Sequence, residues 1–122
     1  MTNKVILVVD DSTTIRKSAE VFLKTTGHQI LMAENGYEAL TIIGQSTPDL
    51  IFLDIVMPRL DGYDTCTLIK MHDSYKKIPV VMLSSKEGLF DQAKAALAGS
   101  NEYMTKPFTR DEITEVVKKH LG

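Results

Sequence analysis

Five short runs of apolar residues recur along the chain, and each has about the length of a β-strand. They cover residues 5–9, 30–33, 50–53, 80–83 and, more weakly, 103–104. The runs lack the alternation of apolar and polar positions that marks a strand with one face in water. Strands that are apolar throughout are typical of a parallel sheet covered by helices on both faces. The pattern therefore predicts a buried parallel sheet.

Helical spacing of apolar residues fills the intervals between these runs. Two stretches share the i, i+4, i+7, i+8 spacing of an amphipathic helix: Ile15, Ala19, Phe22 and Leu23, and Leu89, Ala93, Ala96 and Leu97. Similar stripes mark residues 39–43 and 113–121, and a less clearly patterned helix is expected over residues 63–71. Five strand–helix units predict an α/β fold, a three-layer sandwich with a parallel five-stranded sheet and right-handed crossovers.

Signals for helix ends agree with this reading. Asn35 and Thr109 each precede a glutamate by three residues, which is the spacing of a capping box. Gly27 lies where the first predicted helix should stop.

Length and composition exclude several kinds of function for this chain. The 122 residues fit a single domain, 1–122, and are expected to hold no second domain of ordinary size. The net charge of −2 and the lack of a basic cluster argue against binding to nucleic acid or to an anionic membrane. No signal peptide or membrane-length apolar stretch is visible, so a cytoplasmic location is expected. Cys66 is the single cysteine, which rules out an internal disulfide and predicts a packed thiol.

Polar residues follow four of the five apolar runs. Asp10 and Asp11 follow the first, Asp54 the third, Ser84 the fourth and Lys106 the fifth. In an open parallel sheet, ligands bind at the carboxyl ends of strands near the point where strand order reverses. If the order is 2-1-3-4-5, about 10 Å separates the third strand from the fifth, which a lysine side chain can bridge. We therefore expect these side chains to share one crevice.

The chemistry of this set points to phosphoryl transfer. Three crowded carboxylates repel one another unless a cation lies among them, and their oxygens favour Mg²⁺, which also recruits phosphate oxygens. Asp54 would be the nucleophile that attacks phosphorus. Lys106 would stabilise charge on the phosphoryl oxygens, and Ser84 would donate a hydrogen bond.

Each of these residues alone has an ordinary structural explanation. An acidic residue after a strand often caps the next helix, and a lysine is usually a surface charge. Their placement at the ends of adjacent strands favours the functional reading. His28, His72 and His120 lie outside the set and are expected to be structural or surface residues.

Four motifs carry a family resemblance: Val8-Val9-Asp10-Asp11-Ser12, Asp54-Ile55-Val56-Met57-Pro58 with Asp61-Gly62, Ser84-Ser85-Lys86, and Tyr103-Met104-Thr105-Lys106-Pro107-Phe108. Over essentially its whole length the chain resembles the receiver domains of bacterial two-component response regulators. The resemblance implies a flavodoxin-like (βα)5 fold of order 2-1-3-4-5 and a monomeric signalling switch rather than a conventional enzyme. It also implies a sensor histidine kinase as the phosphodonor.

The resemblance further implies individual roles at the acidic cluster. Asp54 matches the phosphoacceptor. Asp11, Asp54 and the backbone carbonyl of Val56 match the direct ligands of Mg²⁺, with Asp10 acting largely through water. Lys106 matches the lysine beside the phosphoryl group.

Two further positions match the switch of the family. Ser84 corresponds to the hydroxyl that moves toward the phosphoryl group, and Tyr103 corresponds to the aromatic residue that turns inward on activation. The resemblance implies that a downstream protein binds the face formed by the fourth helix, the fifth strand and the fifth helix.

A narrower likeness lies in residues 57–63, 65–66, 68–70 and, above all, 82–91. These segments resemble the stand-alone chemotaxis-type regulators of the chemosensory pathway that controls type IV pili and twitching motility. A phosphate sink without its own output partner and a flagellar chemotaxis regulator remain alternatives.

Two more distant alternatives have less support. A phosphohydrolase with an aspartate nucleophile needs a second acid two residues after Asp54, where Val56 stands. A flavodoxin-like cofactor module needs a phosphate-binding loop after the first strand, and the sequence has none there.

Val56 and Lys86 match the two positions that flank the phosphoryl group in the receiver family. The apolar Val56 predicts slow self-dephosphorylation.

Overall fold

The computed structural model describes residues 3–85 and 88–122 and contains the predicted parallel sheet. Its strand order is β2-β1-β3-β4-β5, with every neighbouring pair parallel. The strands are β1 Val5–Val9, β2 Gln29–Ala33, β3 Leu50–Asp54, β4 Val80–Ser84 and β5 Glu102–Thr105, and the helices are α1 Thr13–Lys24, α2 Gly36–Ser46, α3 Gly62–Met71, α4 Leu89–Leu97 and α5 Arg110–Leu121. The predicted α/β fold and its strand order are confirmed.

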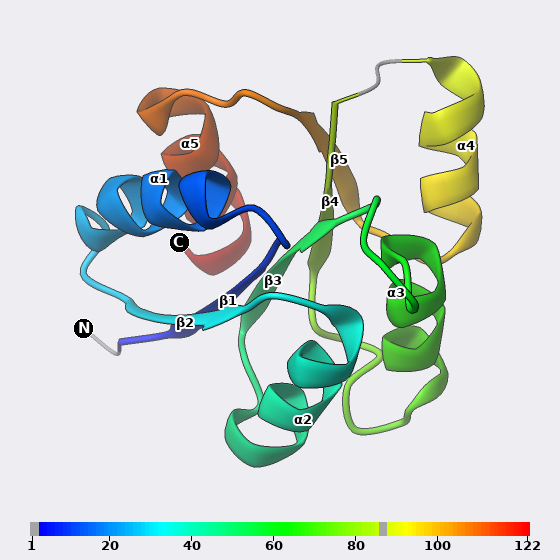
Figure 1. The fold of residues 1–122 in the computed structure, drawn as a ribbon. Coiled ribbons are helices and arrows are strands. Elements are labelled where there is room, and N and C mark those ends of the chain that lie inside the picture. The colour runs from blue at the N-terminus through cyan, green and yellow to red at the C-terminus, as the bar shows by residue number, and fades with distance from the viewer. Residues whose placement is uncertain (1–2, 86–87) are drawn as a thin grey trace.

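Alternate side chains of the central strands enter two separate cores. Leu7 and Leu53 point into the core under α2, α3 and α4, whereas Ile6 and Phe52 point into the core under α1 and α5. Figure 1 shows these two groups of helices on opposite faces of the sheet. Because both faces are covered, the strands have no polar face, which explains their unbroken apolar runs.

Helix α1 is capped by Ser12 and not by the acidic pair Asp10 and Asp11. The Ser12 hydroxyl caps this helix by accepting a hydrogen bond from the Ile15 N–H at 3.3 Å. Asp10 and Asp11 are therefore not the N-cap, and the simplest structural explanation of the acidic pair does not apply. The helix ends at Lys24, three residues before Gly27, whose φ of 80° lies in the left-handed region.

The two predicted capping boxes differ. At α5, Thr109 and Glu112 form the complete reciprocal pair. At α2, Asn35 accepts from the Glu38 N–H at 2.8 Å, but the Glu38 carboxylate accepts from the N–H of Glu34 instead of Asn35. Only half of the predicted box forms at α2.

Helix α4 is present as predicted, but its apolar stripe does not face the core. Leu89 and Leu97 are 85% and 89% exposed, and Ala93 and Ala96 are also exposed. Ala95, on the opposite side, is the one buried residue of this helix. Periodicity identifies an apolar face but does not say what that face contacts. The helix therefore presents a row of apolar side chains to solvent.

The packed thiol that the sequence predicts at Cys66 is confirmed. Cys66 is fully buried in α3, and burial raises the pKa of its thiol to about 11.

Within residues 3–85 and 88–122, none of the helices combines the length and apolar character that a membrane span requires.

Lys70 ties the end of α3 to the beginnings of β4 and β5. Its ammonium group donates to the Ile78 carbonyl at 2.6 Å, to Asn101 Oδ1 at 2.9 Å and to the Lys76 carbonyl at 3.2 Å. We expect Lys70→Met to lower the free energy of unfolding by about 1–2 kcal/mol, because these acceptors lose a charged donor. Urea unfolding measures the loss, and the exposed Lys77→Met is the matched control. Equal stability of both variants would contradict this role.

Candidate functional site

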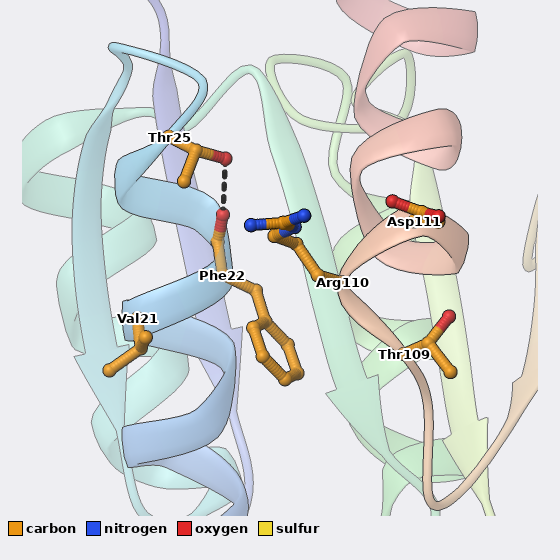
Figure 2. Close-up of a pocket in the computed structure, with 6 residues that line it drawn as sticks. All are labelled: Val21, Phe22, Thr25, Thr109, Arg110 and Asp111. Carbon is orange, nitrogen blue, oxygen red and sulfur yellow. Dashed lines mark hydrogen bonds between the residues drawn. The ribbon is translucent and has the colours of Figure 1, made fainter.

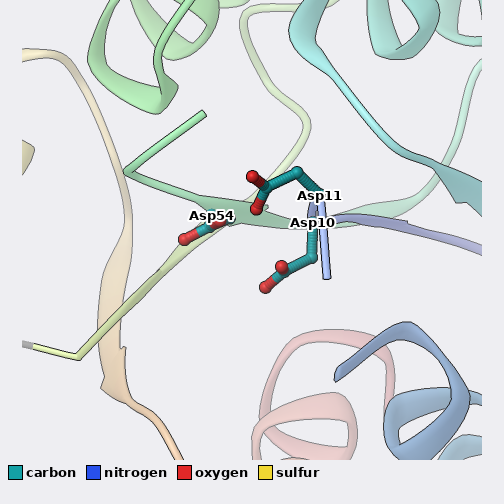
Figure 3. Close-up of side chains that lie close together, drawn as sticks. All are labelled: Asp10, Asp11 and Asp54. Atoms are coloured by element: carbon teal, nitrogen blue, oxygen red, sulfur yellow. The ribbon is translucent and has the colours of Figure 1, made fainter. Parts of the chain in front are cut away.

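The carboxyl ends of β1 and β3 bring three aspartates together (Figure 3). One carboxylate oxygen from each of Asp10, Asp11 and Asp54 lies within 4.8 Å of the others. Asp10 and Asp54 are buried, and Asp11 is exposed. Hard carboxylate oxygens with one side open to water suit Mg²⁺, which binds through few protein ligands and retains water molecules. The donor set therefore fits the predicted cation.

Lys106 reaches this cluster from the end of β5. Its Nζ lies 3.0 Å from Asp10 Oδ2 and 3.0 Å from Asp54 Oδ1. The side chain is only 16% exposed, so its charge is poorly screened by water. The peptide bond between Lys106 and Pro107 is cis. The Lys106 side chain thus reaches from the end of β5 to Asp54 on β3, as the strand order predicts.

Ser84 lies at the end of β4, between the acidic cluster and β5. It is 4% exposed and follows Leu83, which pairs with Asp54 across the β3–β4 ladder. Its carbonyl accepts a hydrogen bond from the Lys106 N–H at 2.7 Å. The same strand ends therefore position the serine and the lysine.

The environment of Asp54 makes its carboxyl hold a proton to a higher pH than an ordinary aspartate does. Burial raises the pKa of the Asp54 carboxyl to about 6, the hydrogen bond from Lys106 opposes this rise, and the charge of Asp10 adds to it. For Lys106, burial acts to lower the pKa, but the hydrogen bonds and charges of Asp54 and Asp10 raise it above the ordinary value. Lys106 is therefore cationic at neutral pH, while Asp54 titrates near the physiological range.

The loop after β3 folds back onto Asp54, which explains the Asp61-Gly62 pair. Asp61 caps α3 by accepting a hydrogen bond from the Asp64 N–H at 2.8 Å. A Cβ on Gly62 would overlap the Asp54 carbonyl oxygen and lie 2.7 Å from the Ile55 Cα. The loop can approach the backbone of the candidate acceptor this closely only with glycine at this position.

A cavity of about 470 Å³ opens beside Ser84, between the loop after β3 and helix α4. Val56, which is 67% exposed, and Phe90 line it together with Tyr63 and Lys94. The Lys94 Nζ lies 4.5 Å from the centre of the Tyr63 ring, within the range of a cation–π contact. The cavity beside Ser84 thus has a partly apolar lining.

Tyr103 and Lys86 are the remaining positions that the sequence predicts near the site. Tyr103, on β5, pairs with Met82 of β4 and packs, half-buried, against the core under α2, α3 and α4. Lys86 lies outside the described residues.

A second hollow, of about 370 Å³, lies between α1 and α5 (Figure 2). The Phe22 ring points between the two helices and forms an edge-to-face contact with Phe108 at 6.3 Å. Val21, Thr25, Thr109, Arg110 and Asp111 complete its lining. It includes none of the predicted site residues, so the aspartate crevice remains the candidate site.

The three histidines lie away from the aspartates, as expected. His28 accepts from the Lys4 N–H at 3.1 Å, and His72 stacks on Tyr75. His120 contacts Glu102 at 2.9 Å. All three have local structural contacts instead of a place in the crevice.

Sequence reasoning missed two groups that hold the acidic turn. The Ser12 N–H donates to Asp10 Oδ1 at 2.9 Å, and Arg16 Nη1 donates to the Asp10 carbonyl at 2.6 Å. The sequence did contain one signal for Arg16, which is its position near the start of a helix. A cation there interacts unfavourably with the helix dipole. Such a placement suggests a specific partner.

Comparisons with known proteins agree with this geometry. Residues 6–118 match the response regulator receiver domain family. Protein PilG of Pseudomonas aeruginosa is 50% identical over 116 residues, which are 95% of this chain and 86% of PilG. Several other relatives are longer, and the chain spans less than half of their length.

Solved structures show the same fold. The chemotaxis protein CheY4 of Vibrio cholerae superimposes with a TM-score of 0.93 at 26% identity, covering 98% of this chain and 100% of CheY4. The receiver domain of the sensor histidine kinase PA1611 from Pseudomonas aeruginosa, with a magnesium ion coordinated in its active-site cleft, superimposes with a TM-score of 0.89 at 25% identity, covering 98% of each chain. With the family match over most of its length, the chain belongs to the response regulator receiver domain family of two-component signalling.

Proposed function

We propose that this receiver domain is a phosphorylation-dependent switch in which Asp54 accepts a phosphoryl group from a phosphohistidine of a sensor histidine kinase. The observation that carries the proposal is the position of Asp54 at the end of β3, within the aspartate cluster and 3.0 Å from the Lys106 ammonium. Among the ion pairs of the described ranges, a buried carboxylate occurs only here, where Asp10 and Asp54 both pair with Lys106.

The transfer is an in-line displacement at phosphorus. A carboxylate oxygen of Asp54 forms the new P–O bond, the P–N bond to the donor imidazole breaks, and the imidazole leaves with the electron pair and takes up a proton. Lys106 stabilises negative charge on the phosphoryl oxygens. Its hydrogen bond to Asp54 also favours the ionised carboxylate that must attack.

Receiver domains bind Mg²⁺ at an acidic pocket, and we propose Asp11, Asp54 and the Val56 carbonyl as its ligands here, with Asp10 acting through water. The magnesium ion in the cleft of the related PA1611 receiver supports this choice. The bound ion would supply positive charge beside the phosphoryl oxygens. Exposed Asp11 leaves one side of the site open to water and to the phosphodonor.

For the output, we propose that the Ser84 hydroxyl moves toward the phosphoryl group and that Tyr103 then turns inward. The two residues lie on adjacent strands, since Ser84 pairs with Thr105, two residues beyond Tyr103. The change alters the face of α4, β5 and α5, and a downstream protein binds it. The exposed apolar row of α4 supports this location, because a group of apolar side chains exposed to solvent is typical of a docking surface.

We propose the type IV pilus chemosensory pathway, in the cytoplasm, as the setting. The support is the likeness of residues 57–63 and 82–91 to regulators of that pathway, and the 50% identity to PilG. Pull-down with the phosphorylated and unphosphorylated protein separates a switch from a phosphate sink. A partner captured only by the phosphorylated form supports the switch, and a protein that drains the kinase but captures no partner supports the sink.

The acceptor assignment is tested by intact-mass spectrometry after incubation with a small phosphodonor and Mg²⁺. We expect the wild type to gain the mass of one phosphoryl group and Asp54→Ala to gain none. Chelation of the metal with EDTA should prevent the gain in the wild type. A mass gain that persists in Asp54→Ala would refute the assignment.

The apolar side chain of Val56, two residues after Asp54, predicts slow loss of the phosphoryl group. Val56 is apolar and cannot orient a water molecule for attack on phosphorus. We expect Val56→Asn to shorten the half-life of the phosphorylated protein severalfold, because the amide can hydrogen-bond that water. The decay of the phosphorylated mass measures it, with the exposed Val21→Asn on α1 as the control. A half-life of seconds that does not change in Val56→Asn would count against this prediction.

A further inference from the structure

Arg16 has an unusual environment for a basic residue in the first half of a helix. Its side chain is only 18% exposed and folds back from α1 toward the turn that carries the acidic pair. Nη1 donates to the Asp10 carbonyl at 2.6 Å, and Nη2 donates to Thr13 Oγ1 at 3.2 Å. Nη2 also lies 3.9 Å from Glu34 Oε2, at the end of β2. The guanidinium thus joins three segments around the acidic turn.

The Asp10 carbonyl belongs to the peptide unit that joins Asp10 to Asp11. The Asp10 N–H donates to the Ala33 carbonyl at 3.1 Å, and Asp10 Oδ1 accepts from the Ser12 N–H at 2.9 Å. With Arg16 on the Asp10 carbonyl, the peptide groups on both sides of the Asp10 Cα are held by hydrogen bonds. Because a peptide unit is planar, its orientation also fixes the position of the Asp11 Cα and the direction of the N–Cα bond that leads to it.

We propose that Arg16 is a positioning residue for the divalent cation of this site. It does not touch the cation, but it holds the peptide between Asp10 and Asp11 so that both carboxylates face Asp54. This inference rests on the proposed function, in which the aspartates bind Mg²⁺. Groups that orient metal ligands in this way affect metal affinity by about 10–100-fold when they are replaced.

The geometry requires arginine and not just a positive charge. Two donors on one planar group reach the Asp10 carbonyl and Thr13 at the same time, while the same group remains near Glu34. A lysine ammonium is a point charge without this fork. Arg16→Lys should therefore lose most of the effect although it keeps the charge.

The test is a Mg²⁺ titration of the unphosphorylated protein, followed by amide chemical shifts in NMR spectra. We expect the dissociation constant to rise about tenfold or more in Arg16→Met and in Arg16→Lys. Lys17→Met, which removes the neighbouring exposed cation, should bind Mg²⁺ as the wild type does. A dissociation constant in both Arg16 variants equal to that of Lys17→Met would overturn the proposal. Normal binding by Arg16→Lys alone would also overturn it, because charge would then be sufficient.

Two further readouts separate positioning from a purely structural role. The phosphorylation rate of the Arg16 variants should require more Mg²⁺ for half-maximal activity and approach the wild-type rate when Mg²⁺ is saturating. If the variants unfold more easily in EDTA but retain wild-type Mg²⁺ affinity, the role is structural and the proposal fails. The titration does not use the phosphodonor, so failure of the Asp54 assignment would appear separately as phosphorylation that persists in Asp54→Ala.

Discussion

Replacing Lys106 by methionine should lower the free energy of unfolding at neutral pH by about 3–5 kcal/mol when no divalent cation is present. The Lys106 ammonium lies 3.0 Å from both Asp10 and Asp54, whose side chains are almost completely buried. Its loss leaves two carboxylates together in a poorly solvated crevice without a counter-charge. Urea unfolding in EDTA measures the change.

Two conditions should restore stability to Lys106→Met. The deficit should shrink as the pH falls, because protonation removes the repulsion between the carboxylates. Added Mg²⁺ should also stabilise the variant, since a ligand that binds only the folded state raises its stability. The exposed Lys118→Met provides the control. An unfolding curve for Lys106→Met that matches the curve for Lys118→Met would show that Lys106 does not neutralise the cluster.

Replacing Asp54 by asparagine should have the opposite effect on stability and raise the free energy of unfolding by about 2–3 kcal/mol at pH 7 in EDTA. Burial raises the pKa of this carboxyl from its ordinary value of 3.8 to about 6. The folded protein therefore holds this proton more tightly than the unfolded chain does. Stability consequently falls as the pH rises from about 4 to 6, and an uncharged amide avoids that loss.

The pH dependence of Asp54→Asn gives the sharper comparison. Its advantage over the wild type should be fully developed above pH 6 and should disappear toward pH 4, where the wild-type carboxyl is protonated in both states. Asp73→Asn removes an aspartate whose side chain is 94% exposed and should leave stability nearly unchanged. An advantage that persists undiminished at pH 4 would show that the raised pKa is not its cause. The predicted gain in stability, present at pH 7 and absent at pH 4, would mean that Asp54 is retained for function at the expense of stability.

The sheet and the crevice could be predicted because burial and topology leave direct traces in the sequence. Strands such as β3 are covered on both faces and therefore have no polar position before Asp54. A parallel sheet of order 2-1-3-4-5 then brings the carboxyl ends of β1, β3, β4 and β5 to one edge, where Lys106 can reach Asp54.

Features that depend on the direction of a side chain could not be predicted in this way. The stripe through Leu89 and Leu97 has helical spacing, but spacing alone does not reveal that it faces solvent. Glu38 has the position of a capping-box residue, yet its carboxylate finds the Glu34 N–H. The position of Arg16 near the start of a helix suggests a specific partner, but only the folded chain identifies that partner as the Asp10 carbonyl.

Chemical localisation of the phosphoryl group tests the central claim most directly. Borohydride reduces an aspartyl phosphate to homoserine, which marks the acceptor within a peptide. After phosphorylation by a small phosphodonor with Mg²⁺, we expect homoserine at position 54 and unmodified aspartate at Asp10 and Asp11. Homoserine at position 10 or 11, with an unmodified Asp54 in the phosphorylated protein, would contradict the account.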